Sequence, residues 1–359
     1  MMSHLSKLFK NYSSTTKDKI GLIYLFLIIF NLLVWVLVFI IFKDYPLMIG
    51  TAVIAYSFGL RHAVDADHIA AIDNVTRKLM QNGEKPVGIG FYFSLGHSTV
   101  VVIASIVIAL TATSLQDKFP ELQTLGSTIG TIVSAGFLFL IAFLNLLILR
   151  NVYLTFTKVK MGTSYNEQSL DHLMNRRGLI SRIFNPLYKL ISRSWHMYPL
   201  GFLFGLGFDT ATEIGLLGIT AVEATKGLSI WAILIFPALF AAGMSLVDTT
   251  DGILMLAAYG WAYVKPLRKL YYNFTITFVS VLIALFVGGI EVLSIIDNKI
   301  GLKGWFVNVI NHLSGDFTLI GYFIIGIFII SWLGSTIIYK LKKFDELETE
   351  NTDALIERA

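Results

Sequence analysis

The sequence predicts an all-α polytopic membrane protein with eight transmembrane helices and both termini in the cytoplasm. Of the 359 residues, 55% are hydrophobic and 14% are charged, whereas soluble domains carry roughly 25% charged residues. Eight segments are also long and apolar enough to cross a bilayer, which takes about 20 residues of helix. They are residues 20–42, 47–72, 87–113, 126–149, 198–220, 229–258, 272–296 and 317–340.

The basic residues predict the orientation of these segments. With eight helices, one side of the membrane receives both termini and 22 of the 28 Lys and Arg residues, the other side receives five, and Arg61 is left inside the second segment. Short loops rich in Lys and Arg stay on the cytoplasmic side. The first apolar run follows a polar tail and is too long for the core of a signal peptide, so we expect a multi-pass protein of the cell membrane.

The chain divides into two halves that share a weak repeat. Residues 1–149 and 198–340 are predicted to form four-helix halves, separated by a basic cytoplasmic loop at 150–197 and followed by an acidic cytoplasmic tail at 341–359. The run Phe-Gly-Leu at 58–60 recurs at 204–206. Because the second helix would run inward and the fifth outward, helices 2–3 and 5–6 are candidates for an inverted repeat, an architecture that places substrates near the bilayer midplane.

An ionisable cluster in the second segment is the main indication of function. It comprises Arg61, His62, Asp65, Asp67 and His68. Charges at membrane depth are costly unless they are paired or hydrated, so such a cluster indicates a functional site. Helical spacing places His62, Asp65 and His68 on one broad face. Asp67 would point away in a regular helix, so we predict that the helix is bent or unwound near Asp65–Asp67.

This cluster has two interpretations. Two imidazoles with carboxylates suit Ni²⁺, Co²⁺, Zn²⁺ or Cu²⁺ better than Mg²⁺ or Ca²⁺, and the chain has no cysteine that could supply a thiolate. The alternative is a structural ion-pair cluster in which Arg61 binds Asp65 and the histidines bond to carbonyl groups. Metal binding is the interpretation we favour, because a packing role does not require so many costly side chains.

Further candidate ligands lie on three other helices. His97 lies in the third segment opposite Asp248 of the repeat, and Asp67 falls opposite Glu213. Asp209 and Glu213 have i, i+4 spacing, and Asp248 and Asp251 have i, i+3 spacing, so each pair can face one direction. These four acids are predicted either to coordinate a cation or to relay protons coupled to transport.

Weaker candidates for the pathway or for positioning the ligands surround these residues. They are Arg61, Asp73, Ser98, Thr99, Asn145, Thr210, Thr212 and Thr249. Asp73 lies at the inner end of its helix and is expected to be either a solvated boundary charge or a relay. Asn145 is expected to make a helix–helix hydrogen bond or to line the pathway. Glu291 is expected to reach the membrane interface.

Four runs of the sequence resemble the signatures of the nickel/cobalt transporter family. They are residues 62–69, 93–101, 206–214 and 243–252, in the family's order and on the expected helices. The resemblance implies high-affinity uptake of Ni²⁺, sometimes Co²⁺, by a secondary permease. By motif position it implies that the metal path comprises His62, Asp65, Asp67, His68, His97, Asp209, Glu213, Asp248 and Asp251.

We therefore expect a transporter that imports Ni²⁺ or Co²⁺ as its substrate, is coupled to protons, and needs no prosthetic group and no nucleic acid. An efflux permease for the same metals is the alternative. Efflux is less favoured because the long loop carries only His172 and His196. A membrane metalloenzyme is disfavoured because no His-Glu-x-x-His run exists, although a hydrolase built on His62 and His68 stays open.

Overall fold

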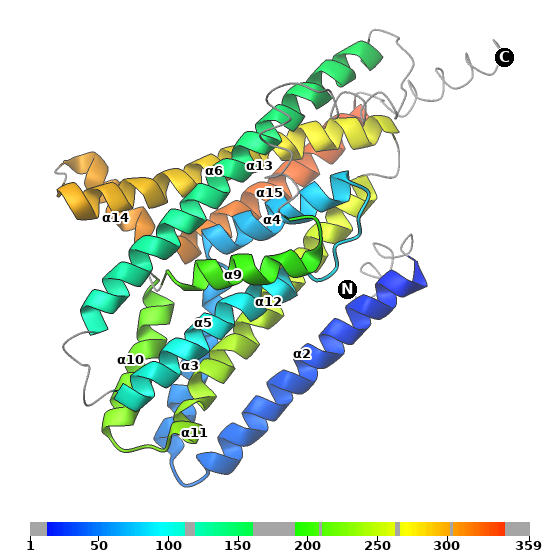
Figure 1. Ribbon diagram of the computed structural model, residues 1–359. Helices are drawn as coiled ribbons and strands as arrows, with labels where there is room; N and C mark the ends of the chain where they lie inside the picture. Colours follow the sequence, from blue (N-terminus) through cyan, green and yellow to red (C-terminus); the bar gives the residue numbers. More distant parts are fainter. Residues whose placement is uncertain are drawn as a thin grey trace.

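The computed structural model describes residues 13–111, 119–160, 191–207, 210–262, 266–301 and 304–341, and within these ranges the chain is helical and has no strand. The predicted all-α class is thereby confirmed. Figure 1 shows the helices in chain order. They are α2 (Ser14–Ile41), α3 (Pro46–His62), α4 (Ala66–Gln81), α5 (Ile89–Thr111), α6 (Phe119–Lys160), η1 (Ser194–His196), α9 (Met197–Gly205), α10 (Ala211–Thr225), α11 (Ile230–Ile233), α12 (Ile235–Ala262), α13 (Pro266–Ile300), α14 (Trp305–Ser314) and α15 (Phe317–Leu341).

Most of the predicted membrane segments coincide with long apolar helices. In the described ranges, six helices are long and apolar enough to cross a membrane, or seven if α3 and α4 form one bent span. The predicted fifth segment, 198–220, is instead divided between α9 and α10, which have nine and 15 residues. Each is shorter than the roughly 20 residues that a span requires. The count of eight therefore stays a prediction, and the loop at 150–197 and the tail at 341–359 lie largely outside the described residues.

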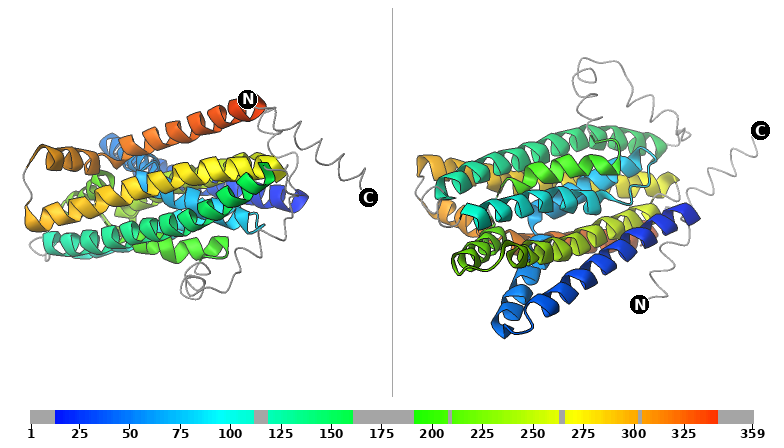
Figure 2. Two further views of the ribbon diagram at one scale, coloured as in Figure 1. Left: turned by 90° about the horizontal axis from the view of Figure 1, so that it is seen from above. Right: turned by 60° about the horizontal axis from the view of Figure 1, so that its bottom comes forward.

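Helix α4 lies at the centre of the bundle (Figure 1). Every residue from His68 to Met80 is buried, because α4 is surrounded by α5, α6, α12, α13 and α15. This cover explains how α4 can carry buried polar residues such as Asp73, Asn74 and Arg77, which would be costly against lipid. By contrast, α2 runs along the outside of the bundle (Figure 2), and its apolar window is only 17% buried.

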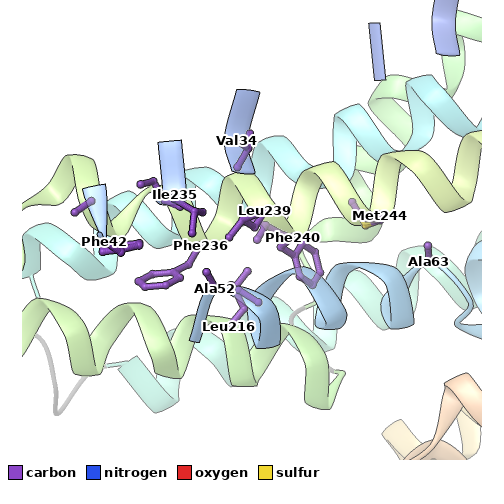
Figure 3. Packing of buried hydrophobic residues seen from close by; sticks show 14 residues of the cluster. Val34, Phe42, Ala52, Ala63, Leu216, Ile235, Phe236, Leu239, Phe240 and Met244 are labelled. Atoms are coloured by element: carbon purple, nitrogen blue, oxygen red, sulfur yellow. The ribbon is translucent and has the colours of Figure 1, made fainter. Parts of the chain in front are cut away.

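A hydrophobic cluster joins α3, α10 and α12. Figure 3 shows Phe236, Leu239 and Phe240 of α12 packed around Ala52 of α3 and Leu216 of α10. All five side chains are fully buried. Burying an aromatic or leucine side chain of this kind contributes about 1.5–3 kcal/mol, so the cluster fixes how α3 and α12 lie against each other.

Two glycines allow the helices that carry the candidate ligands to approach closely. A Cβ atom at Gly59 of α3 would lie 2.1 Å from the carbonyl oxygen of Phe240 in α12. A Cβ atom at Gly96 of α5 would lie 2.0 Å from the carbonyl oxygen of Tyr198 in α9. Small residues are the usual means by which membrane helices reach such contact. As a result α3 packs on α12, and α5 packs on α9.

Candidate metal site

The bend predicted in the second segment is present. Helix α3 ends at His62, α4 begins at Ala66, and the two axes differ by 48°. Asp65 is the N-cap of α4, with an extended backbone (φ −62°, ψ 145°). Aspartate is favoured there because its carboxylate usually accepts a hydrogen bond from the first turn. Here the carboxylate makes no such bond and instead contacts His62 and Thr318.

Three histidines from three helices meet at this break. His62 is the last residue of α3, His68 lies in the first turn of α4, and His97 lies in α5. Their exposed fractions are 1%, 0% and 3%, and one ring nitrogen from each lies within 4.8 Å of the others. The Nε2 atoms of His62 and His97 are 3.0 Å apart. The structure therefore brings three predicted ligands around one small, buried volume.

Two carboxylates contact the far nitrogens of these rings. Asp65 Oδ2 lies 2.8 Å from His62 Nδ1, and Asp248 Oδ1 of α12 lies 3.3 Å from His68 Nδ1. A carboxylate that accepts a hydrogen bond from one ring nitrogen fixes the tautomer and leaves the other nitrogen free to bind a metal. In the described part of the chain, His68 Nε2 is buried without a hydrogen-bond partner. A cation would satisfy this nitrogen.

A second interrupted helix reaches the same histidines. Helix α9 ends at Gly205 and α10 begins at Ala211, and Glu213 lies in the first turn of α10. Glu213 Oε1 lies 2.8 Å from His97 Nε2 and 3.8 Å from His62 Nε2. This carboxylate, which the sequence repeat places opposite Asp67, therefore brings a second kind of donor atom, an oxygen, against two of the three imidazoles.

The threonines at the start of α10 complete this side. Thr210 is the N-cap of α10, and its hydroxyl accepts a hydrogen bond from the Glu213 amide. It also donates to Glu213 Oε2 at 3.3 Å. The hydroxyls of Thr210 and Thr212 each lie 3.3 Å from His62 Nδ1. The cap therefore positions Glu213 and places polar groups beside His62.

The remaining predicted ligands lie nearby or outside the described residues. Asp67 is in the first turn of α4 and is partly buried. Asp251 lies in α12, one turn after Asp248. Its Oδ2 atom has no hydrogen-bond partner among the residues that the structure describes. Asp209 falls on a residue outside the described ranges.

Three of the weaker candidates flank the site. Ser98 and Thr249 are 6% and 1% exposed, next to His97 and Asp248 in sequence. Thr99 is only half-buried; its hydroxyl bonds to the Leu95 carbonyl and lies 3.1 Å from the Tyr198 hydroxyl of α9. Ser98 and Thr249 are therefore the better placed of the three to lie on a buried pathway.

Two acids are more buried than the sequence indicated. Asp73 is fully buried and accepts hydrogen bonds from Tyr259 and, at 2.7 Å, from Ser280. The interpretation of Asp73 as a solvated boundary charge is therefore wrong. Glu291 is 4% exposed and accepts a 2.7 Å hydrogen bond from Ser134, so the expectation that it reaches the interface is also wrong. In both cases a neighbouring helix covers the acid and supplies hydroxyl donors.

The structure also separates the alternatives for two other residues. Asn145 of α6 donates a 2.7 Å hydrogen bond to Asn74 of α4, so the helix–helix contact is present. Arg61 pairs with Asp316 at 3.1 Å and not with Asp65. The alternative of a structural ion-pair cluster between Arg61 and Asp65 is therefore wrong. The partners of Asp65 are His62 and Thr318.

Sequence reasoning missed the contribution of α15. Thr318 donates to Asp65 at 2.5 Å, and Asp316 pairs with Arg61. The only signal was an acid and a threonine at the start of the last apolar segment. Such residues are also common helix caps, so the signal does not distinguish a cap from a site residue.

The nitrogen and oxygen donors at this site suit a borderline transition-metal ion. Two nitrogens bound at about 2.1 Å and at a right angle to one metal ion would be about 3.0 Å apart, which is the separation of the Nε2 atoms of His62 and His97. Right angles are typical of square-planar or octahedral coordination, as Ni²⁺ adopts. Without an ion, the same contact requires a proton on one of the two nitrogens.

The fold and this site define a class: a polytopic helical membrane protein with a buried cluster of histidines and carboxylates able to hold a metal ion. The particular family follows from comparison with known proteins. Residues 48–338 match the NicO family, described as high-affinity nickel-transport protein. The chain belongs to this family, which includes the nickel/cobalt transporters that its motifs resemble.

Similar proteins from other organisms carry consistent names. The high-affinity nickel transport protein of Cupriavidus necator is 55% identical over 338 residues, which cover 94% of this chain and 96% of that protein. The high-affinity nickel-transport protein NixA of Helicobacter pylori is 47% identical, covering 84% of this chain and 91% of that protein. The cobalt transport protein NhlF of Rhodococcus rhodochrous is 42% identical, covering 82% and 83% respectively. No solved structure matches the chain.

These names agree with the prediction that the chain is a transporter and not an enzyme. They also support a divalent transition-metal ion as the substrate, because nickel and cobalt transport proteins both occur among the relatives.

Proposed function

We propose that this protein is a secondary transporter that imports Ni²⁺, and also Co²⁺, across the cell membrane. The observation that carries the proposal is the meeting of His62, His68 and His97 from three helices in a buried volume. A buried imidazole nitrogen without a hydrogen-bond partner, as His68 Nε2 is among the described residues, is costly in a membrane interior. Binding of a transported metal ion to the three Nε2 atoms would remove that cost.

Each group has a role in this proposal. The Nε2 atoms of His62, His68 and His97 bind the ion, and Glu213 supplies an oxygen ligand. Asp65 and Asp248 hold the Nδ1 protons of two of these rings. Asp67, Asp209 and Asp251 complete the carboxylate path between the site and the two sides of the membrane.

We propose that the two halves form the inverted repeat that the sequence suggested. Both interrupted helices end within two residues of a Phe-Gly-Leu run, and each continues with an acid in its first turn, Asp67 in α4 and Glu213 in α10. The helix contacts also agree with a repeat. The first half of each interrupted helix packs on a helix of the other repeat: α3 packs on α12, and α9 packs on α5. Rocking one repeat against the other around a site at the midplane would give alternating access. In this arrangement α3–α4 and α9–α10 each count as one of eight spans, and both termini are cytoplasmic.

Proton coupling follows from competition at the same nitrogens. An imidazole binds a metal ion only in its neutral form, so metal binding and protonation exclude each other. Release of the ion on the cytoplasmic side would allow His62, His97 or Glu213 to take up protons before the empty carrier returns. If protons accompany the cycle, a pH gradient must change the rate of uptake.

The proposal is tested with purified protein in liposomes, by measuring the uptake of radioactive nickel. We expect uptake by the wild type, loss of uptake in His62→Ala and Asp67→Asn, and normal insertion of both variants. Unchanged uptake in both would refute the site at the break. Glu291→Gln is a matched control because it alters a buried acid that contacts Ser134 of α6.

The coupling ion requires a second arm of the same experiment. Uptake is measured with and without a pH gradient that is acidic on the cytoplasmic face of the protein. Collapse of this gradient by an ionophore should slow uptake, because protons leave as the metal ion enters. If collapse of the gradient does not change the rate of uptake, proton coupling is wrong, but the proposal of metal transport is unaffected. Right-side-out vesicles loaded with nickel report efflux and so test the direction of transport.

A further inference from the structure

We propose that Thr318, at the start of α15, is a positioning residue for the metal site. It fixes the carboxylate of Asp65, which in turn keeps the Nε2 atom of His62 facing the other two imidazoles. Arg61 and Asp316 fix Thr318 from outside. The inference rests on the proposed function, in which His62 binds the transported ion.

The first step is the contact between Thr318 and Asp65. The Thr318 hydroxyl donates to Asp65 Oδ1 at 2.5 Å, while Asp65 Oδ2 lies 2.8 Å from His62 Nδ1. The two oxygens of one carboxylate are thus held from two directions, which fixes its plane. Thr318 and Asp65 are 6% and 1% exposed, so bulk water has little access to replace either bond.

The second step is the direction of the hydrogen bonds. Arg61 Nε lies 3.2 Å from the Thr318 oxygen, and a guanidinium group can only donate. The oxygen of Thr318 therefore accepts from Arg61, and its own hydrogen is committed to Asp65. Asp65 then has to accept at Oδ1, and its other oxygen is left to receive the proton of His62 Nδ1. The imidazole is held in the tautomer whose Nε2 can bind a metal.

The third step is the anchoring of Arg61. Arg61 Nη2 donates to Asp316 Oδ1 at 3.1 Å, and the same oxygen accepts the Leu319 amide at 3.2 Å. Asp316 is thus fixed to the first turn of α15. The ion pair is about half exposed, and exposed ion pairs are generally weak. Arg61 and Asp316 should therefore contribute less to positioning than the buried hydroxyl of Thr318.

The backbone of α15 supports the same contact. A Cβ atom at Gly321 would lie 1.6 Å from the carbonyl oxygen of Val64, within the break between α3 and α4. Thr318 and Gly321 are three residues apart and therefore lie on one face of the helix. Helix α15 thus touches the break at two points, and the glycine permits the approach that the Thr318 hydroxyl needs.

Two variants distinguish a positioning role of the Thr318 hydroxyl from a role of Thr318 in packing alone. Thr318→Val keeps the shape of the side chain and removes the hydroxyl, whereas Thr318→Ser keeps the hydroxyl and removes a methyl group. The readout is titration of the purified protein in detergent with Co²⁺ alone, followed by the ligand-field absorption of the bound ion. Ser335→Ala is the matched control, because it removes a buried hydroxyl from the same helix.

We expect Thr318→Val to weaken Co²⁺ binding about tenfold, at the lower end of the effect of groups that orient metal ligands. The absorption bands should also shift, and KM for nickel uptake should rise by a similar factor. Thr318→Ser should restore the affinity and the spectrum. Ser335→Ala should match the wild type in both measurements.

Several outcomes would overturn the inference. The inference is wrong if Thr318→Val binds Co²⁺ with unchanged affinity and spectrum while His62→Ala abolishes the Co²⁺ signal. In that case the proposed function is unaffected. A Thr318→Ser variant as weak as Thr318→Val would also refute the role of the hydroxyl. If His62→Ala leaves the spectrum intact, the proposed site itself is wrong, and the inference falls with it.

A second variant keeps the inference testable if Thr318→Val cannot be purified in folded form. Arg61→Gln replaces a pure donor with a group that can accept the hydrogen of Thr318, so the amide competes with Asp65. We expect a several-fold loss of Co²⁺ affinity and a change in the spectrum. Wild-type binding by a folded Arg61→Gln protein would overturn the inference.

Discussion

Asp248 offers a quantitative test of how carboxylates orient the histidines. It is fully buried, and its Oδ1 atom lies 3.3 Å from His68 Nδ1. Asp248→Asn keeps the size and one acceptor oxygen but removes the charge. A hydrogen bond to a charged group is roughly twice as strong as a neutral one, and loss of an orienting partner generally costs about 10–100-fold in metal affinity. Because the amide can still accept, we expect about a tenfold loss, equivalent to about 1.4 kcal/mol.

The assay is the saturation curve of nickel uptake in liposomes that contain equal amounts of inserted protein. We expect KM to rise about tenfold in Asp248→Asn, and the Glu291→Gln control to keep the wild-type value. Because Glu291 is buried and contacts Ser134, the control makes the same chemical change away from the histidines. A wild-type KM in Asp248→Asn would refute the argument that this carboxylate orients His68.

Three further changes test the packing and the second side of the site. Gly59→Val should lower the melting temperature in detergent, because its Cβ would lie 2.1 Å from the Phe240 carbonyl and overpacking costs about 1–3 kcal/mol; a wild-type melting temperature would contradict the close approach. Asn145→Ala should destabilise the protein by about 0.6 kcal/mol, the average for hydrogen bonds between membrane helices, with uptake retained; abolished uptake would place Asn145 on the pathway. Glu213→Gln should reduce metal affinity at least tenfold, measured by Co²⁺ titration, because it replaces a charged oxygen ligand beside His97 Nε2 with a neutral amide; unchanged affinity would remove Glu213 from the site.

Much of the fold was predictable from hydropathy and from one geometrical conflict. The apolar segments gave the positions of most long helices, because lipid requires long, apolar and internally hydrogen-bonded spans. The bend between α3 and α4 was predicted because a regular helix would turn Asp67 away from His62 and Asp65. The structure has a break between His62 and Ala66 with a 48° bend, which confirms the bend.

The break between α9 and α10 was not predicted. Residues 198–220 are apolar on average although they contain Asp209 and Glu213, and an average hydropathy does not show whether a segment forms one helix or two. The glycines before the break and Thr210 at the N-cap of α10 were local signals of a new helix start. They carried little weight because glycine and threonine are also common inside membrane helices.

The candidate site was predictable in its residue types but not in its contacts. His62, His68 and His97 stood out because imidazoles are rare in apolar helices. Spacing along one helix gives no information on how helices are rotated against each other, so Asp248 could not be assigned to His68 in advance. Thr318 gave no distinct signal, because its contact with Asp65 spans 253 residues of sequence.

The most direct test of the central claim is X-ray absorption spectroscopy of the purified protein loaded with one equivalent of Ni²⁺. We expect a shell of nitrogen and oxygen atoms with the multiple-scattering signature of three imidazoles. His97→Ala, if it retains the ion, should show one imidazole fewer. A shell of oxygen atoms alone, or a spectrum that is the same in the wild type and in the variants of all three histidines, would contradict the claim that His62, His68 and His97 bind the transported metal.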